Sequence, residues 1–261
     1  MRDSITARSI IQNSLSGTAV KHDNGKRNGQ SMTTTEKTES MVLADLLDNR
    51  WSCRGFLPES VPREIIEQVL DLAHKTPSWC NTQPWNTIIT AGQGTEHFRD
   101  ALSAYAASNA TLEPHFEFPL KYDGVYQQRR RECGAALYES VGVVRGDRAA
   151  SAREALRNFS FFDAPHTAVI TSPADLGVYG AIDCGLYVET FLLAAQSLGL
   201  GAVPQAAFAA HADFVRDHFG LGEDRMVVCG ISFGYPDPDH RANGFRTTRA
   251  KLADTYDWVD A

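Results

Sequence analysis

Apolar residues recur with the period of an α-helix along much of this chain. Residues 62–75 show the pattern well, because their apolar side chains fall on one helical face and Pro62 suits a first turn. That face consists of Ile65, Ile66, Val69 and Leu72. The same pattern predicts further helices near residues 41–49, 95–108, 126–144, 147–159 and 212–220.

Segments rich in β-branched residues predict strands at residues 85–91, 165–172 and 225–234, and residues 202–208 form a shorter extended piece. Residues 180–201 are apolar nearly all the way round, which predicts a helix buried between layers at the centre of the protein. No internal repeat is visible. No glycine-rich phosphate motif follows a strand, so neither a Rossmann nor a P-loop site is expected.

The first 40 residues differ from the rest of the chain. They are rich in Ser, Thr, Asn and Gly and lack Phe, Trp and Tyr, so burial cannot offset the entropy of ordering them. We expect a flexible N-terminal tail over residues 1–40 and a single domain over residues 41–261. With 43% hydrophobic residues in a chain of 261, a sizeable core can form.

Charge and cysteine content exclude several classes of function. The chain has 25 Lys and Arg against 32 Asp and Glu, a formal charge of −7, so neither nucleic acid nor an anionic membrane is an expected partner. Its five cysteines are scattered without a Cys-x-x-Cys pair, so we expect no metal site and a reducing compartment. Neither a secretory signal nor a membrane span is evident, which favours a cytoplasmic protein.

The segment RWSCR is a candidate anion site. If it is extended, Arg50, Ser52 and Arg54 lie on one side, and two guanidinium groups flanking a hydroxyl suit a phosphate. An exposed basic turn would show the same spacing. Near the C-terminus, Arg246 and Arg249 form a second cluster that could close on the same anion.

The run TPSWCNTQPWN is too polar for a core and too aromatic for an ordinary surface loop. Pro77 ends the preceding helix and Pro84 favours an extended Gln83, so a fixed loop is expected. The amides of Asn81 and Gln83 could pair with the polar edge of a heterocycle. The simpler interpretation is that Trp85 fills the core and Asn81 caps a turn.

Taken together, RWSCRGF, TPSWCNTQPWN, LGLGAVPQAAF and the terminal RTTR resemble the FMN-dependent nitroreductase family over Asp45–Trp258. Each motif alone is weak, whereas their combination in this order is specific. Residues 126–166 resemble the branch that reduces nitrobenzoates and related nitroaromatics. The resemblance implies an α+β, three-layer fold with a mostly antiparallel sheet between helices. It also implies an interwoven homodimer, with the 180–199 helix in the interface and the residues after Arg249 extending over the partner.

The resemblance also implies a set of FMN contacts. The phosphate and ribityl group would be bound by Arg50, Ser52 and Arg54, with Arg249 closing on the phosphate. A loop with Pro77, Ser78, Trp79 and Asn81 would reach the flavin from the other subunit. Gln128 and Arg131 would face its pyrimidine edge and N1, where a cation stabilises reduced flavin.

The backbone N–H of Ala206, beside Pro204 and Gln205, would donate to flavin N5. The family more often has an acidic residue and a glycine where this chain has Ala206 and Ala207. A backbone donor does not depend on side-chain identity, so that hydrogen bond is expected to survive, while substrate preference at this edge is put in doubt.

The implied activity is reduction of nitroaromatic compounds by NAD(P)H in a ping-pong exchange at the flavin, without a side chain acting as acid or base. Alternatives with the same fold are a quinone or enone reductase, a dehalogenase, or a noncatalytic flavin-binding redox protein. A cysteine hydrolase using Cys80 is a further alternative. Asp183 and Glu189 fall on different faces of their helix, so each is expected to cap or pair with another element.

Overall fold

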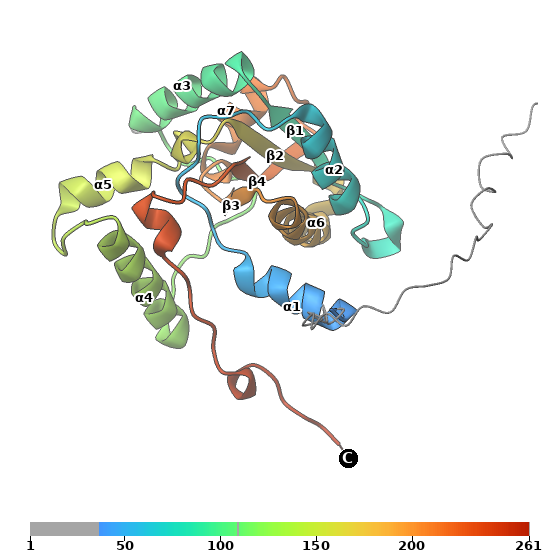
Figure 1. Cartoon of the computed structure of the whole chain (residues 1–261). Coiled ribbons are helices and arrows are strands. Elements are labelled where there is room, and N and C mark those ends of the chain that lie inside the picture. The colour runs from blue at the N-terminus through green and yellow to red at the C-terminus, as the bar shows by residue number, and fades with distance from the viewer. Residues whose placement is uncertain (1–36, 109, 261) are drawn as a thin grey trace, which may run out of the picture. The chain divides into compact units, whose positions relative to one another are not determined.

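The computed structural model describes residues 37–108 and 110–260. Its helices are α1 (Glu39–Asn49), α2 (Arg63–Ala73), α3 (Gln93–Ala107), α4 (Gly124–Ser140), α5 (Arg148–Leu156), α6 (Gly177–Ser197) and α7 (Ala212–His218). Its strands are β1 (Asn86–Thr90), β2 (His166–Pro173), β3 (Gly201–Gln205) and β4 (Arg225–Gly234) (Figure 1). Every predicted helix and strand is present with shifted ends, and the extended piece at residues 202–208 becomes β3 followed by a turn. Most of the predicted tail lies outside the described residues.

The strands form one antiparallel sheet in the order β1-β2-β4-β3, which confirms the predicted α+β class. Helices cover both of its faces. Along β2, Ala168 and Ile170 belong to the cluster with α2 and α6, whereas Val169 belongs to the cluster with α3 and α7. This alternation is the period of two that a strand between two layers requires.

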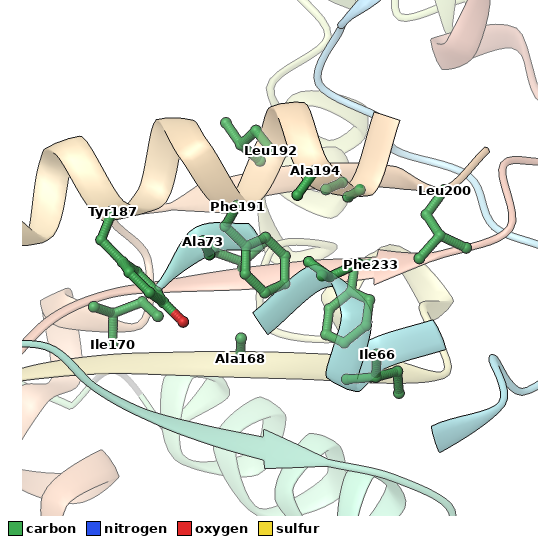
Figure 2. Packing of buried hydrophobic residues seen from close by; sticks show 14 of the residues in the cluster. Ile66, Ala73, Ala168, Ile170, Tyr187, Phe191, Leu192, Ala194, Leu200 and Phe233 are labelled. Atoms are coloured by element: carbon green, nitrogen blue, oxygen red, sulfur yellow. The ribbon is translucent and has the colours of Figure 1, made fainter. Parts of the chain in front are cut away.

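The cluster on the α6 side forms the larger part of the core. Figure 2 shows Tyr187 and Phe191 of α6 pointing toward Ala168 and Ile170 of β2. Trp85 stacks on Tyr187 with ring centroids 5.0 Å apart and is 8% exposed, so the simpler interpretation of this tryptophan, as a core residue, is confirmed.

A β-bulge divides β4 between the two clusters. Ile170 pairs with Cys229 and Thr171 pairs with Val227, so Val228 is an extra residue in the ladder. Val227 and Ile231 are four residues apart, so in a regular strand their side chains would point to the same face of the sheet. Because of the bulge, Val227 packs on the α3 side and Ile231 packs on the α6 side.

Helix α6 departs from the prediction that it is buried all round. Asp183, Cys184 and Phe191 are buried, but Ile182 and Leu186 are about half exposed. One face contacts α2, β2 and β3, α1 contacts a further part of the helix, and Val178, Ile182 and Leu186 stay exposed in the single chain. By length and composition Ala174–Ser197 could also cross a membrane, but half of its most apolar window is buried in the fold, as in the core helix of a globular protein.

Candidate functional site

The predicted anion-binding segment lies along the outer edge of β3. Ser52 bridges Ala202 in parallel fashion, and the Cys53 N–H donates to the Ala202 carbonyl at 3.1 Å. Cys53 is fully buried, whereas Arg50, Ser52 and Arg54 stay partly exposed. The segment is therefore extended, as predicted, and its alternation leaves these polar side chains partly accessible.

Asn243 joins this segment to the C-terminal part of the chain. Its Oδ1 accepts from the Arg54 N–H at 2.9 Å and its Nδ2 donates to the Gly55 carbonyl at 2.7 Å. Close by, the Arg246 guanidinium lies 4.3 Å from the ring centroid of Trp51, in a cation–π contact. Arg246 of the C-terminal cluster is thus brought beside residues 50–54, from which it is distant in sequence.

The arginines of the first cluster have different surroundings. Arg50 Nε is buried, lies 3.7 Å from Glu189 Oε1, and has no hydrogen-bond partner among the described residues. The Arg54 guanidinium lies 5.8 Å from the centroid of Phe162, and its Nη1 donates to the Ser52 carbonyl at 3.2 Å. Burial lowers the pKa of Arg54, and nearby Cys133 and Glu154 oppose that effect.

Two cavities flank α4. One of about 560 Å³ lies between α4 and residues 245–250, and Gln128, Arg246 and Arg249 are among its lining residues. Arg131 instead lines a cavity of about 1190 Å³ with residues of the α4–α5 connection. The structure therefore places Gln128 with the C-terminal arginines and turns Arg131 toward the neighbouring cavity.

The end of β3 presents an exposed backbone. Gln205 is buried, its Nε2 donates to the Asn158 carbonyl at 2.8 Å, and its Oε1 accepts from the Ser232 hydroxyl. Pro204 and Ala206 are exposed on either side of it. Within the described chain the Ala206 N–H donates to no other residue. The Gln205 side chain is thus committed to the protein interior, and the Ala206 N–H is available to a ligand.

The loop after α2 is exposed and strongly turned. Cys80, Asn81 and Gln83 have φ values of 51°, 56° and 47°. The expectation that Gln83 is extended was wrong, because its N–H donates to Ser78 Oγ at 2.9 Å and closes the loop. The Trp79 side chain is 61% exposed and packs on Tyr179, with centroids 4.7 Å apart.

The loop lies apart from the two cavities. None of the predicted loop contacts lines either of them, and the same holds for the predicted contacts at residues 50–54 and 204–206. The predicted loop contacts are Pro77, Ser78, Trp79 and Asn81. Within one chain, the structure does not bring these residues together with the C-terminal arginines that line the smaller cavity.

A sequence profile of the Nitroreductase family matches residues 47–235. The chain belongs to the nitroreductase family. Nitroreductase NfnB of Mycolicibacterium smegmatis is 35% identical over 214 residues, covering 80% of this chain and 89% of that protein. The 4-nitrobenzoate reductase of Pseudomonas putida is 32% identical over 201 residues, covering 77% and 88%.

Solved nitroreductases share the fold. The FMN-dependent nitroreductase NfnB from Mycobacterium smegmatis in complex with NADPH superimposes with a TM-score of 0.81 at 32% identity, over 85% of this chain and 99% of that one. The predicted family and its α+β fold are confirmed.

The groups in this nitroreductase site fit FMN chemically. The buried Arg50 Nε without a hydrogen bond and the meeting of residues 50–54 with Arg246 suit a phosphate, and the free Ala206 N–H suits a flavin ring nitrogen. Among the residues described, no three His, Cys, Asp or Glu side chains are grouped so that they could hold a metal ion.

Sequence reasoning missed the residues that hold this site together. Asn243 contacts Arg54 across 189 residues of sequence, and Arg157 Nη2 donates to the Arg54 carbonyl at 3.2 Å. Neither lies in a motif that signals this role. Asp183 and Glu189 were each expected to cap or pair with another element, and the structure agrees. Asp183 accepts from the Trp79 N–H, and Glu189 pairs with Arg50.

Proposed function

We propose that this protein is an FMN-dependent oxidoreductase that uses NAD(P)H to reduce nitroaromatic compounds. The observation that carries the proposal is the meeting of residues 50–54 with Arg246, through Asn243 and Trp51, in a nitroreductase chain. Of the related proteins, one was solved with NADPH and another is a 4-nitrobenzoate reductase.

The basic residues would bind the phosphate end of FMN. Arg50 and Arg54 approach it from the edge of β3, with Ser52 beside the ribityl chain. Arg246 and Arg249 approach it from the C-terminal segment, where Thr247 and Thr248 also line the smaller cavity. Arginine suits this task because its planar guanidinium pairs with two phosphate oxygens at once.

The ring end of the site rests on β3 and α4. Bound FMN would accept a hydride from the nicotinamide and pass two electrons to the nitro group. The Ala206 N–H would hold a ring nitrogen, while Pro204 has no N–H to compete for it. Gln128 would meet the polar edge of the ring from the cavity that it shares with Arg249. Arg131 could assist only after turning from the neighbouring cavity.

We further propose a homodimer in which the loop at residues 77–83 completes the partner's site. The exposed apolar side of α6 supports it, because Val178, Ile182 and Leu186 lie along that side and the loop packs against α6 through Trp79 and Tyr179. A second copy covering this apolar face would remove it from water. The C-terminal segment also exposes Leu252, Tyr256 and Trp258, which a partner could cover.

We place the protein in the cytoplasm. All five cysteines are free thiols, and none forms a disulfide. Cys53 and Cys184 are fully buried. This cysteine pattern is typical of reducing compartments.

The test is spectroscopic and kinetic. Purified protein should be yellow, NADPH or NADH should bleach the flavin, and 4-nitrobenzoate should restore the colour with turnover. Initial rates at several NAD(P)H and acceptor concentrations should give parallel double-reciprocal lines. A colourless protein that takes up no FMN, or a flavin that NAD(P)H does not bleach, would refute the proposal. Turnover of a quinone with no turnover of any nitroaromatic would refute the substrate class.

A further inference from the structure

Asp183 is a carboxylate in an unusual position. The residue lies on α6 and is 5% exposed, and both carboxylate oxygens accept from the Trp79 N–H at 3.2 Å. Across the described part of the chain, no other hydrogen bond and no ion pair reaches this carboxylate. Burying a carboxylate is unfavourable unless its partners compensate, so core packing alone does not explain an acid here.

Asp183 accepts its hydrogen bond from Trp79, which is the first residue of a strained turn. Cys80, Asn81 and Gln83 all adopt left-handed backbone conformations, which are disfavoured for residues with side chains. Such a turn persists only when its surroundings hold it. Helix α6 holds it twice, because Asp183 binds the Trp79 backbone and Tyr179 packs against the Trp79 ring.

We propose that Asp183 is a positioning residue that fixes the loop at residues 77–83 so that Ser78 and Asn81 can reach the flavin. The inference rests on the proposed function. The Asp183 side chain accepts a hydrogen bond from the loop backbone with both of its oxygens, and hydrogen bonds to carboxylates are stronger than those between neutral groups. Losing it releases the start of the loop while the rest of α6 keeps its packing on β2 and α2.

The geometry separates this role from general stabilisation of the fold. The Asp183 carboxylate accepts its hydrogen bond from the loop and not from the sheet. Thr95 Oγ1, on the α3 side of the sheet, instead donates to Thr90 Oγ1 and to the Pro165 carbonyl. Thr95→Val is therefore a matched control, because it removes a buried hydrogen-bonding group without touching the loop.

The first experiment compares wild type, Asp183→Ala, Asp183→Asn and Thr95→Val in the dimeric protein reconstituted with FMN. Asp183→Ala should weaken FMN binding about 10- to 100-fold and shift the absorption maxima of the bound flavin. Asp183→Asn keeps an oxygen acceptor and should stay within about threefold of wild type. Thr95→Val should lower the melting temperature and leave FMN affinity and spectrum unchanged.

The second experiment asks which subunit the loop serves. Arg50→Ala and Asp183→Ala chains, carrying different affinity tags, are co-expressed and the heterodimer is isolated. If each loop serves the partner's flavin, one site of the heterodimer combines an intact Arg50 with an intact loop. It should then bind one FMN per dimer with wild-type affinity, although both parent homodimers bind FMN weakly.

The outcomes are distinct. If the wild-type protein does not bind FMN, the proposed function itself is refuted. Wild type that binds FMN while Asp183→Ala matches it in affinity and spectrum overturns the role of Asp183 and leaves the proposed function standing. A heterodimer with no tight site overturns the action across the subunit boundary.

Discussion

The Val61 N–H donates to His166 Nε2 at 2.9 Å, while His166 Nδ1 lies 3.1 Å from the Thr90 carbonyl. The imidazole therefore joins the segment before α2 to the β1–β2 layer as the neutral tautomer that carries its proton on Nδ1. It is almost completely buried and stacks on Phe233. Protonation of Nε2 would remove the acceptor for Val61 and bury a charge.

This arrangement predicts a loss of stability in acid. Burial lowers the pKa of His166 below its ordinary 6.5, with the Thr90 hydrogen bond opposing the effect. The unfolded chain thus binds a proton that the folded chain resists, so stability is complete above about pH 6.5 and falls as the pH drops below it. Urea unfolding between pH 7.5 and 5 should show this slope.

A variant isolates the contribution of His166. Burial also lowers the pKa values of His211 and His218. The change of wild-type stability with pH therefore adds the contributions of all three histidines. His166→Phe should be less stable at pH 7.5 and should show a shallower loss toward pH 5. An identical slope in both proteins would contradict the assignment.

Arg50→Ala and Arg249→Ala should weaken FMN retention more than folding. Each change removes a charge-assisted contact worth about 1.5–3 kcal/mol, or roughly 10- to 100-fold in the dissociation constant. Arg63→Ala is the control, because Arg63 is exposed on α2 and pairs only with Glu67 in the described chain. Flavin content after dialysis measures the effect, and variants that stay fully yellow would count against the phosphate assignment.

Ile182→Asp should separate the subunits. Ile182 is 52% exposed in the single chain, and a carboxylate there would have to be buried when a second chain covers α6. We expect the dimer dissociation constant to rise more than about tenfold, with loss of FMN in parallel. Sedimentation velocity at several concentrations measures this. Arg63→Glu, a charge change elsewhere on the surface, should leave the dimer intact.

The five cysteines should differ sharply in reactivity. Burial raises the pKa of Cys53 to about 11 and those of Cys184 and Cys229 to about 12, so these thiols stay protonated at pH 8. Cys80 and Cys133 are exposed. Ellman's reagent should modify these two first, and all five after unfolding in guanidinium. Cys80→Ser should retain reductase activity within about twofold, whereas a cysteine hydrolase would lose its function.

Local elements were predictable because local physics sets them. The apolar stripe of α2, the β-branched run of β2 and the proline before α2 each act within a few residues. The family was also predictable, because its motifs survive as short strings such as RWSCR and TPSWCNTQPWN. The conformation of Gln83 was not, because a hydrogen bond from its own N–H to Ser78 Oγ overrode the usual preference before proline.

By itself the sequence determined the α+β elements, the two basic clusters and the loop rich in tryptophan and amides. Only the tertiary structure decided which of them meet. Asn243 and Trp51 join residues 50–54 to Arg246 across most of the chain, and α6 leaves Ile182 and Leu186 exposed although its composition is apolar nearly all round. The reason is physical: helical period and propensity are local properties, whereas hydrogen bonds such as that between Asp183 and Trp79 depend on how distant segments pack.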